Sequence, residues 1–130
     1  MINWLAVIVV ALIYFAIHFF WYFPPIFGNA WLRLVGKKSE PKSKIIRDTI
    51  IMIPTSIITI LILAVLMEFT GMIDLLSAIL LSLLVWIGFV ATIGINQNNF
   101  NDRAVKLFLL EYGFYLIGLI IAGIILAVWR

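Results

Sequence analysis

The sequence lacks charge over four long stretches. No Asp, Glu, Lys or Arg occurs in residues 1–32, 49–67, 75–101 or 112–129 of the 130-residue chain. Each stretch holds about twenty or more residues, most of them apolar, which is the length that crosses a ~30 Å hydrocarbon layer as a helix. Four such stretches leave no room for a separate soluble domain. The sequence therefore predicts one domain, an all-α membrane protein with four transmembrane helices in an antiparallel bundle.

Cysteine is absent, which excludes disulfide bonds, thiolate nucleophiles and thiolate metal sites. Histidine occurs once, and zinc sites use at least three protein ligands, so we expect no metal site and no cofactor. The chain has no His-Glu-x-x-His, Gly-x-Ser-x-Gly or glycine-rich phosphate motif, so we expect no enzymatic activity. Its net charge of +3 comes from cations beside the spans, which argues against a nucleic-acid partner.

Turn and cap residues separate the spans. Pro24-Pro25 ends the first span because proline lacks the N–H donor and disfavours a helical residue before it. Gly71 fits a C-cap after the second span, and Asp74 and Asp102 fit N-caps of the third and fourth. The predicted spans are residues 3–23, 49–69, 75–95 and 104–129.

The cations are distributed unevenly among the connections. The first and third loops hold eight of the nine, namely Arg33, Lys37, Lys38, Lys42, Lys44, Arg47, Arg103 and Lys106. The second loop has none, and the chain ends on Arg130. The positive-inside rule places the first and third loops in the cytoplasm and both termini outside. Trp4 and Trp129 then lie at the outer interface and Trp21 at the inner one, as expected of interfacial tryptophans.

Between the first two spans, residues 26–35 carry Phe27, Trp31, Leu34 and Val35 at helical spacing. This pattern favours a short helix lying in the inner interface, and the alternative is a turn anchored by aromatic residues. With the basic segment 36–47 the region offers a surface for anionic lipid or a partner. The residues assigned to this surface are Trp31, Arg33, Lys37, Lys38 and Lys42.

The aromatic residues also form a recognisable set. They give Trp21-Tyr22-x-Pro24, Phe27-Gly28-x-x-Trp31, Trp86-x-Gly88-Phe89 and Tyr112-Gly113-x-Tyr115. The set resembles the bacterial and archaeal membrane family called domain of unknown function 1761, over nearly the whole chain. The resemblance implies a small four-span protein of the plasma membrane of a prokaryote, without an established activity, and it supplies no catalytic residues.

Polar side chains inside the spans mark helix contacts and sometimes pathways. At ~1.5 Å per residue, one group lies ~13–15 Å from the inner ends of the spans, and this group is Tyr14, Thr59, Trp86 and Tyr115. A second group lies ~7–9 Å from those ends, and it is His18, Thr55 and Glu111. Thr55, Thr59 and Trp86 are interpreted as midplane packing residues whose polar groups bond across helices.

Two functional hypotheses remain open. In the first, the chain forms a small homo-oligomeric transport or channel-like protein, in which Glu111 binds a cation or proton and His18 shares it. Tyr14 and Tyr115 complete that site because each lies four residues from one of the pair. We accordingly predict that Glu111 and His18 lie close together. In the second, the chain is a non-transporting accessory or structural protein that binds lipid or a partner through the Trp31 segment and loop 36–47. The alternative to a functional role for Glu111 is that it snorkels to the interface or pairs there with Arg103 or Lys106.

Overall fold

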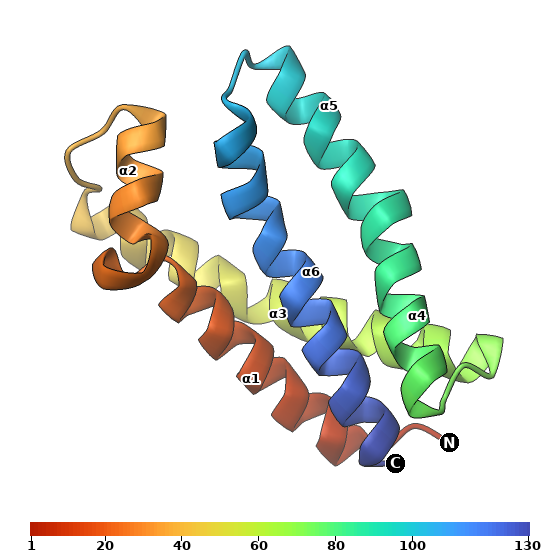
Figure 1. Cartoon of the computed structure of the whole chain (residues 1–130). Helices are drawn as coiled ribbons and strands as arrows, with labels where there is room; N and C mark the ends of the chain where they lie inside the picture. The colour runs from red at the N-terminus through yellow and green to blue at the C-terminus, as the bar shows by residue number, and fades with distance from the viewer.

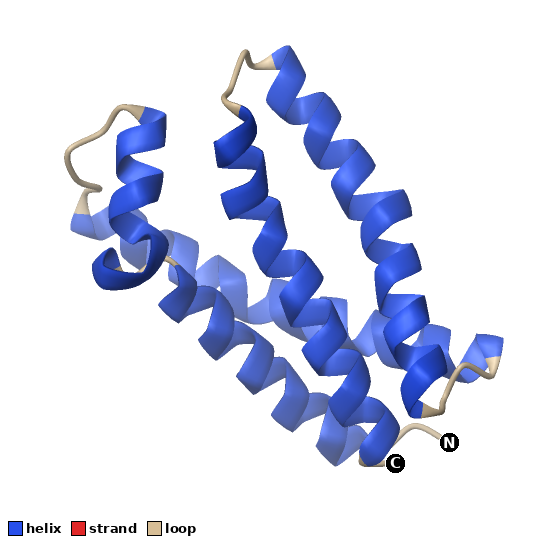
Figure 2. Cartoon of the chain, viewed as in Figure 1, coloured by secondary structure: helices blue, strands red, loops and turns tan.

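The computed structural model describes all residues, 1–130, and consists of helices joined by loops (Figure 2). The spans are α1 (Trp4–Trp21), α3 (Lys42–Thr70), a third helix made of α4 (Leu75–Val85), η2 (Trp86–Ala91) and α5 (Thr92–Phe100), and α6 (Val105–Val128). All four are long and apolar enough to cross a membrane. The predicted class, a four-helix membrane bundle, is confirmed.

The last helix, α6, lies at the centre of the bundle. It contacts α1, α3 and every segment of the third span (Figure 1). The second span, α3, packs along α1 and meets the third span near the turn that joins the two. Both chain ends lie close to that turn, where the Met1 amino group and the Arg130 guanidinium each pair with Glu68. The termini therefore share one end of the bundle, as an even number of spans requires.

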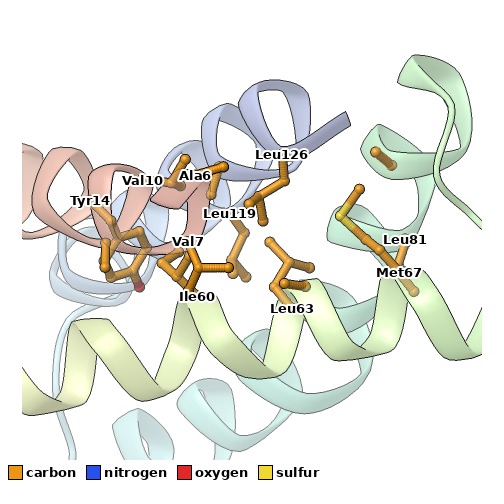
Figure 3. Packing of buried hydrophobic residues seen from close by; sticks show 14 of the residues in the cluster. Ala6, Val7, Val10, Tyr14, Ile60, Leu63, Met67, Leu81, Leu119 and Leu126 are labelled. Carbon is orange, nitrogen blue, oxygen red and sulfur yellow. The ribbon is translucent and has the colours of Figure 1, made fainter. Parts of the chain in front are cut away.

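Apolar side chains from all four spans form one core (Figure 3). Small residues from three helices, Ala6, Ala64 and Ala122, are buried in it and let the backbones approach closely. The fully covered larger side chains include Ile60, Leu63, Met67 and Phe114. Most other apolar side chains point outward, as expected of helices whose solvent is hydrocarbon.

The segment after α1 forms a wide π turn, η1 (Pro24–Gly28), followed by the short helix α2 (Asn29–Val35). The helix predicted over residues 26–35 is thus present, although its first turn belongs to η1. Gly28 allows this turn because a Cβ atom there would collide with the carbonyl oxygen of Tyr22. Gly36 ends α2 with φ +77°, a backbone conformation that glycine adopts without strain.

Two helices extend beyond the predicted spans. The second begins at Lys42 instead of residue 49, and the third continues to Phe100 instead of residue 95. The early start of α3 is stabilised by ion pairs on its first turns, with Lys44 Nζ 2.8 Å from Asp48 and 3.6 Å from Glu40. At the start of α3, charged residues therefore end the apolar stretch without ending the helix.

The predicted caps had different outcomes. The prediction for Asp74 is confirmed, because its carboxylate accepts the Ser77 N–H at 3.1 Å, and Gly71 is the C-cap of α3 with φ +70°. The prediction for Asp102 is wrong. Asp102 has φ +52° in the loop, and the N-cap position of α6 is Ala104, which makes no side-chain cap bond. The Asn98 amide instead donates to the carbonyl oxygen of Ala104 at 3.1 Å and thereby closes the α5–α6 loop.

Candidate functional site

Glu111, on the second turn of α6, is the best-connected polar group of the membrane region. Its Oε2 atom accepts a hydrogen bond from the Trp31 indole at 2.8 Å. The same oxygen lies 2.9 Å from the Arg103 guanidinium, and the two side chains are 18% and 30% exposed, respectively. A carboxylate paired in this way has its charge balanced inside the chain.

Local structure explains why Trp31 reaches α6. The Trp21 indole, at the end of α1, donates to the carbonyl oxygen of Leu110 at 3.0 Å. Its ring packs against Phe27 of η1, with centroids 4.5 Å apart. These contacts hold the π turn against α6, and α2 then runs beside the first turns of α6 (Figure 1). The Trp31–Glu111 bond is therefore a second contact between this segment and α6, after the one that Trp21 makes.

Tyr22 lies at the centre of the same cluster. Its ring is 6.1 Å from the Trp31 ring and 5.9 Å from the His18 ring. Burial, followed by the negative charge of Glu111, raises the pKa of the Tyr22 hydroxyl above its usual range. The phenol thus stays neutral beside the Glu111–Arg103 pair.

His18 occupies an aromatic environment. Its ring stacks on Phe114 with centroids 4.2 Å apart and an interplanar angle of 7°, and the Tyr115 ring is 5.5 Å away. No hydrogen bond joins His18 to Glu111, whose partners are Trp31 and Arg103. The two predicted site residues therefore belong to one end of the bundle, but each has different immediate neighbours.

The predicted midplane residues separate into two groups. The Trp86 indole donates to the Tyr112 carbonyl oxygen at 2.9 Å and so bonds across helices, as expected. The Thr55 and Thr59 hydroxyls instead donate to Ile51 and Thr55 of their own helix, at 3.0 and 2.8 Å. Their expected interhelical bonds are absent, because a hydroxyl in a helix reaches the carbonyl four residues earlier more easily than another helix.

Tyr14 packs on α6. The centre of its ring lies 5.0 Å from the centre of the Phe114 ring. A Cβ atom at Gly118 would stand 2.8 Å from the Tyr14 ring. The absence of a side chain at Gly118 thus lets the Tyr14 ring approach α6 closely. The Tyr115 ring lies beside the rings of His18 and Phe114 and so belongs to the same contact.

The basic residues of the predicted surface differ in their pairing. Lys37 pairs with Glu40 at 3.1 Å and lies 5.9 Å from the centre of the Trp31 ring. Arg33, Lys38 and Lys42 are exposed and have no carboxylate within ion-pair distance. Trp31 itself differs from expectation, since its indole is turned inward to Glu111 and only part of its ring faces outward.

Sequence reasoning missed two contacts that organise the bundle. Trp21 was interpreted only as an interface anchor, although its indole bonds to α6. Ser82 was not singled out, yet its hydroxyl is fully buried and lies 3.0 Å from the Leu119 carbonyl oxygen. The signal for Ser82 was its place opposite Gly123 at a close helix contact, which only the pairing of α4 with α6 reveals.

The family model described as protein of unknown function, DUF1761, matches residues 5–127. The chain belongs to this family. No curated protein and no solved structure matches it. Membership in the DUF1761 family confirms the resemblance drawn from the aromatic motifs and leaves the activity to be inferred from the site. The structure contains no group of three or more His, Cys, Asp or Glu side chains placed to hold a metal ion.

Proposed function

We propose that this DUF1761 protein is a non-transporting, non-enzymatic accessory or structural membrane protein that binds anionic lipid headgroups at its cytoplasmic end. The observation that carries the proposal is the bond from Trp31 to Glu111 at 2.8 Å. This bond fixes α2 against α6. Arg33 of α2, Lys38 of the following loop and Lys42 at the start of α3 have no carboxylate partners.

The same contacts argue against transport through Glu111. A cation-binding carboxylate has to be free to exchange its ion, whereas Glu111 is already paired with Arg103 at 2.9 Å. His18 has its ring face covered by Phe114 and makes no bond to the carboxylate. Neither Glu111 nor His18 lines the groove between α3 and the third span.

Electrostatics gives the expected strength of lipid binding. Each Lys or Arg near an anionic membrane surface contributes about 1 kcal/mol. Three unpaired cations together would then contribute up to about 3 kcal/mol. Exposed apolar residues of the adjoining turn, Ile26 and Phe27, add contact with the acyl region.

The test compares lipid retention by native mass spectrometry after purification from mixed phosphatidylglycerol and phosphatidylcholine. We expect retained phosphatidylglycerol, lost in the Arg33→Gln/Lys38→Gln/Lys42→Gln variant. The matched control is Lys37→Gln/Lys44→Gln, which removes two cations that already have carboxylate partners and should reduce retention less.

Equal phosphatidylglycerol retention in the triple variant and the wild type would contradict the proposal. Ion flux into proteoliposomes that Glu111→Gln abolishes would favour transport instead. The same spectra report subunit number, for which we propose a homo-oligomer.

A further inference from the structure

A groove of about 480 Å³ runs between α3 and the third span, with α6 as its floor. Its rim consists of the exposed side chains Ile58 and Ile62 of α3, Phe89 of η2 and Ile93 of α5. These residues face hydrocarbon, so the groove opens sideways into the bilayer. Its volume lies in the range typical of small-molecule sites, which also occur between the helices of bundles.

The groove carries three phenol groups without protein partners. Tyr14, Tyr112 and Tyr115 all line it, and none of their hydroxyls takes part in a protein hydrogen bond. Tyr14 is only 4% exposed, and its side chain is directed from α1 toward α3 (Figure 3). Thr59, the other hydroxyl residue of the lining, already donates to Thr55.

These hydroxyls need an acceptor. The three oxygens are not sealed inside the protein, where the side-chain oxygens without a hydrogen bond belong to Ser56, Glu68 and Asn98, so they open into the groove. An unpaired polar group that faces hydrocarbon is costly. No water is available at the level of the middle of the spans. The acceptor would therefore come from a molecule that enters the groove from the membrane.

The lining defines the chemistry of that molecule. It contains no charged side chain, which excludes the counter-ion that a carboxylate or phosphate head would require. Tyr14 and the α3 residues of the lining lie near the middle of their helices, away from the interface where phospholipid headgroups and ester groups reside, and Ile93 extends the groove toward α5. Four aromatic rings, those of Tyr14, Phe89, Tyr112 and Tyr115, offer faces and edges to a flat ring.

We propose that this groove binds a neutral, lipid-soluble ring carrying carbonyl acceptors and an apolar tail, the chemistry of an isoprenoid quinone. The phenols of Tyr14, Tyr112 and Tyr115 donate to the ring carbonyls, and the tail leaves between Ile62 and Phe89 into the bilayer. The π segment η2 contributes Phe89 and Val90 to the wall, a placement consistent with the frequent occurrence of π segments at functional sites. This site is separate from the cytoplasmic lipid surface and does not depend on it.

Binding is tested with decylubiquinone as the probe and with decylbenzene, which has a ring and the same tail but lacks the carbonyl and methoxy groups. The purified protein in detergent micelles is titrated with decylubiquinone, and quenching of tryptophan fluorescence by the quinone gives its dissociation constant. The affinity for decylbenzene, which is not a quencher, is measured by its displacement of decylubiquinone. We expect decylubiquinone to bind and decylbenzene to bind at least tenfold more weakly.

Three single variants, Tyr14→Phe, Tyr112→Phe and Tyr115→Phe, keep the rings and remove one hydroxyl each. Because each substitution removes one hydrogen bond to the ligand, each single variant should bind decylubiquinone about fivefold more weakly than the wild type. The triple variant should bind it more weakly still. Tyr22→Phe is the control, because Tyr22 lies outside the groove, and its affinity should stay within twofold. Circular dichroism of each variant without ligand confirms the fold.

Four results would overturn the proposal. The first is the absence of decylubiquinone binding by the folded wild type. The second is equal affinity for decylubiquinone and decylbenzene. The third is an unchanged decylubiquinone affinity in the triple variant. The fourth is a disulfide between subunits that joins Ile62→Cys of one copy to Phe89→Cys of another in high yield, which would assign the groove to a second copy of the chain.

Discussion

Gly123 of α6 lies where α6 and α4 approach most closely, so substituting it tests how the bundle is packed. A Cβ atom at this position would stand 2.5 Å from Ser82 Oγ and 3.1 Å from the Ala78 carbonyl oxygen. Both neighbours belong to α4, and Ser82 is fully buried. The Ser82 hydroxyl lies 2.9 Å from the Ala78 carbonyl oxygen of its own helix and 3.0 Å from the Leu119 carbonyl oxygen of α6, so its one proton is shared between the two helices. Gly123→Ala must therefore move α4 away from α6.

The expected cost has two parts. Overpacking a close contact costs about 1–3 kcal/mol, since the Ala78 backbone cannot rotate away as a side chain can. Separating the helices also weakens the Ser82–Leu119 bond, and interhelical hydrogen bonds in membrane proteins are worth about 0.6 kcal/mol on average. We therefore expect Gly123→Ala to lower the free energy of unfolding by about 2–3 kcal/mol relative to a Gly→Ala change on the same helix that meets no neighbour, because the gain in helix propensity is common to both.

Gly113 provides the matched control on the same helix. Nothing lies within 4 Å of a Cβ atom placed there. Because alanine is the better helix former by up to about 1 kcal/mol, Gly113→Ala should be neutral or slightly stabilising. Unfolding of both variants by sodium dodecyl sulfate, followed by circular dichroism in the same mixed micelles, measures the difference.

Equal stability of Gly123→Ala and Gly113→Ala would refute the close α4–α6 contact. Adding Ser82→Ala to Gly123→Ala removes the hydroxyl at 2.5 Å but leaves the Ala78 carbonyl oxygen in place. The double variant should regain part of the lost stability. A purely additive loss would show that the Ser82 hydroxyl is not the group that the new methyl displaces.

Three further predictions use other parts of the bundle. Trp86→Ala should lower the melting temperature in detergent more than Trp129→Ala does, because the Trp86 indole bonds to another helix while Trp129 lies at the chain end; a larger shift for Trp129→Ala would refute this ranking. In the cysteine-free chain, Ile2→Cys should react with an impermeant maleimide outside intact cells and Lys42→Cys should not; labelling of position 42 would reverse the topology. Trp31→Phe should speed amide exchange in α2 and leave α4 unchanged, and unaltered exchange in α2 would mean that the bond to Glu111 does not hold this helix.

Much of the fold is determined by the sequence alone, because the bilayer imposes a simple rule on length and charge. About twenty residues without charge must form a helix that satisfies its own backbone, so four such stretches predict four spans. Pro24-Pro25, Gly71 and Asp74 place turns for equally local reasons. Helix ends were predicted less well. Charged segments such as 42–48 can continue a helix into water through i,i+4 ion pairs, which a membrane-length rule does not consider.

The partners of the polar side chains were decided by the tertiary structure. Glu111 could be singled out from the sequence, but depth along a helix does not say which neighbour rotates toward it. The π turn at residues 24–28 carries Trp31 to the carboxylate, and the bend before α6 carries Arg103. His18 instead meets the face of Phe114.

The groove and the α4–α6 contact are likewise properties of packing. Tyr14, Tyr112 and Tyr115 are ordinary aromatic residues in the sequence. They line one groove only because α3 packs on α1 while the third span packs on α6. A span is determined by the composition of one segment, whereas a site is determined by the angles between segments. Hydropathy carries no information about these angles.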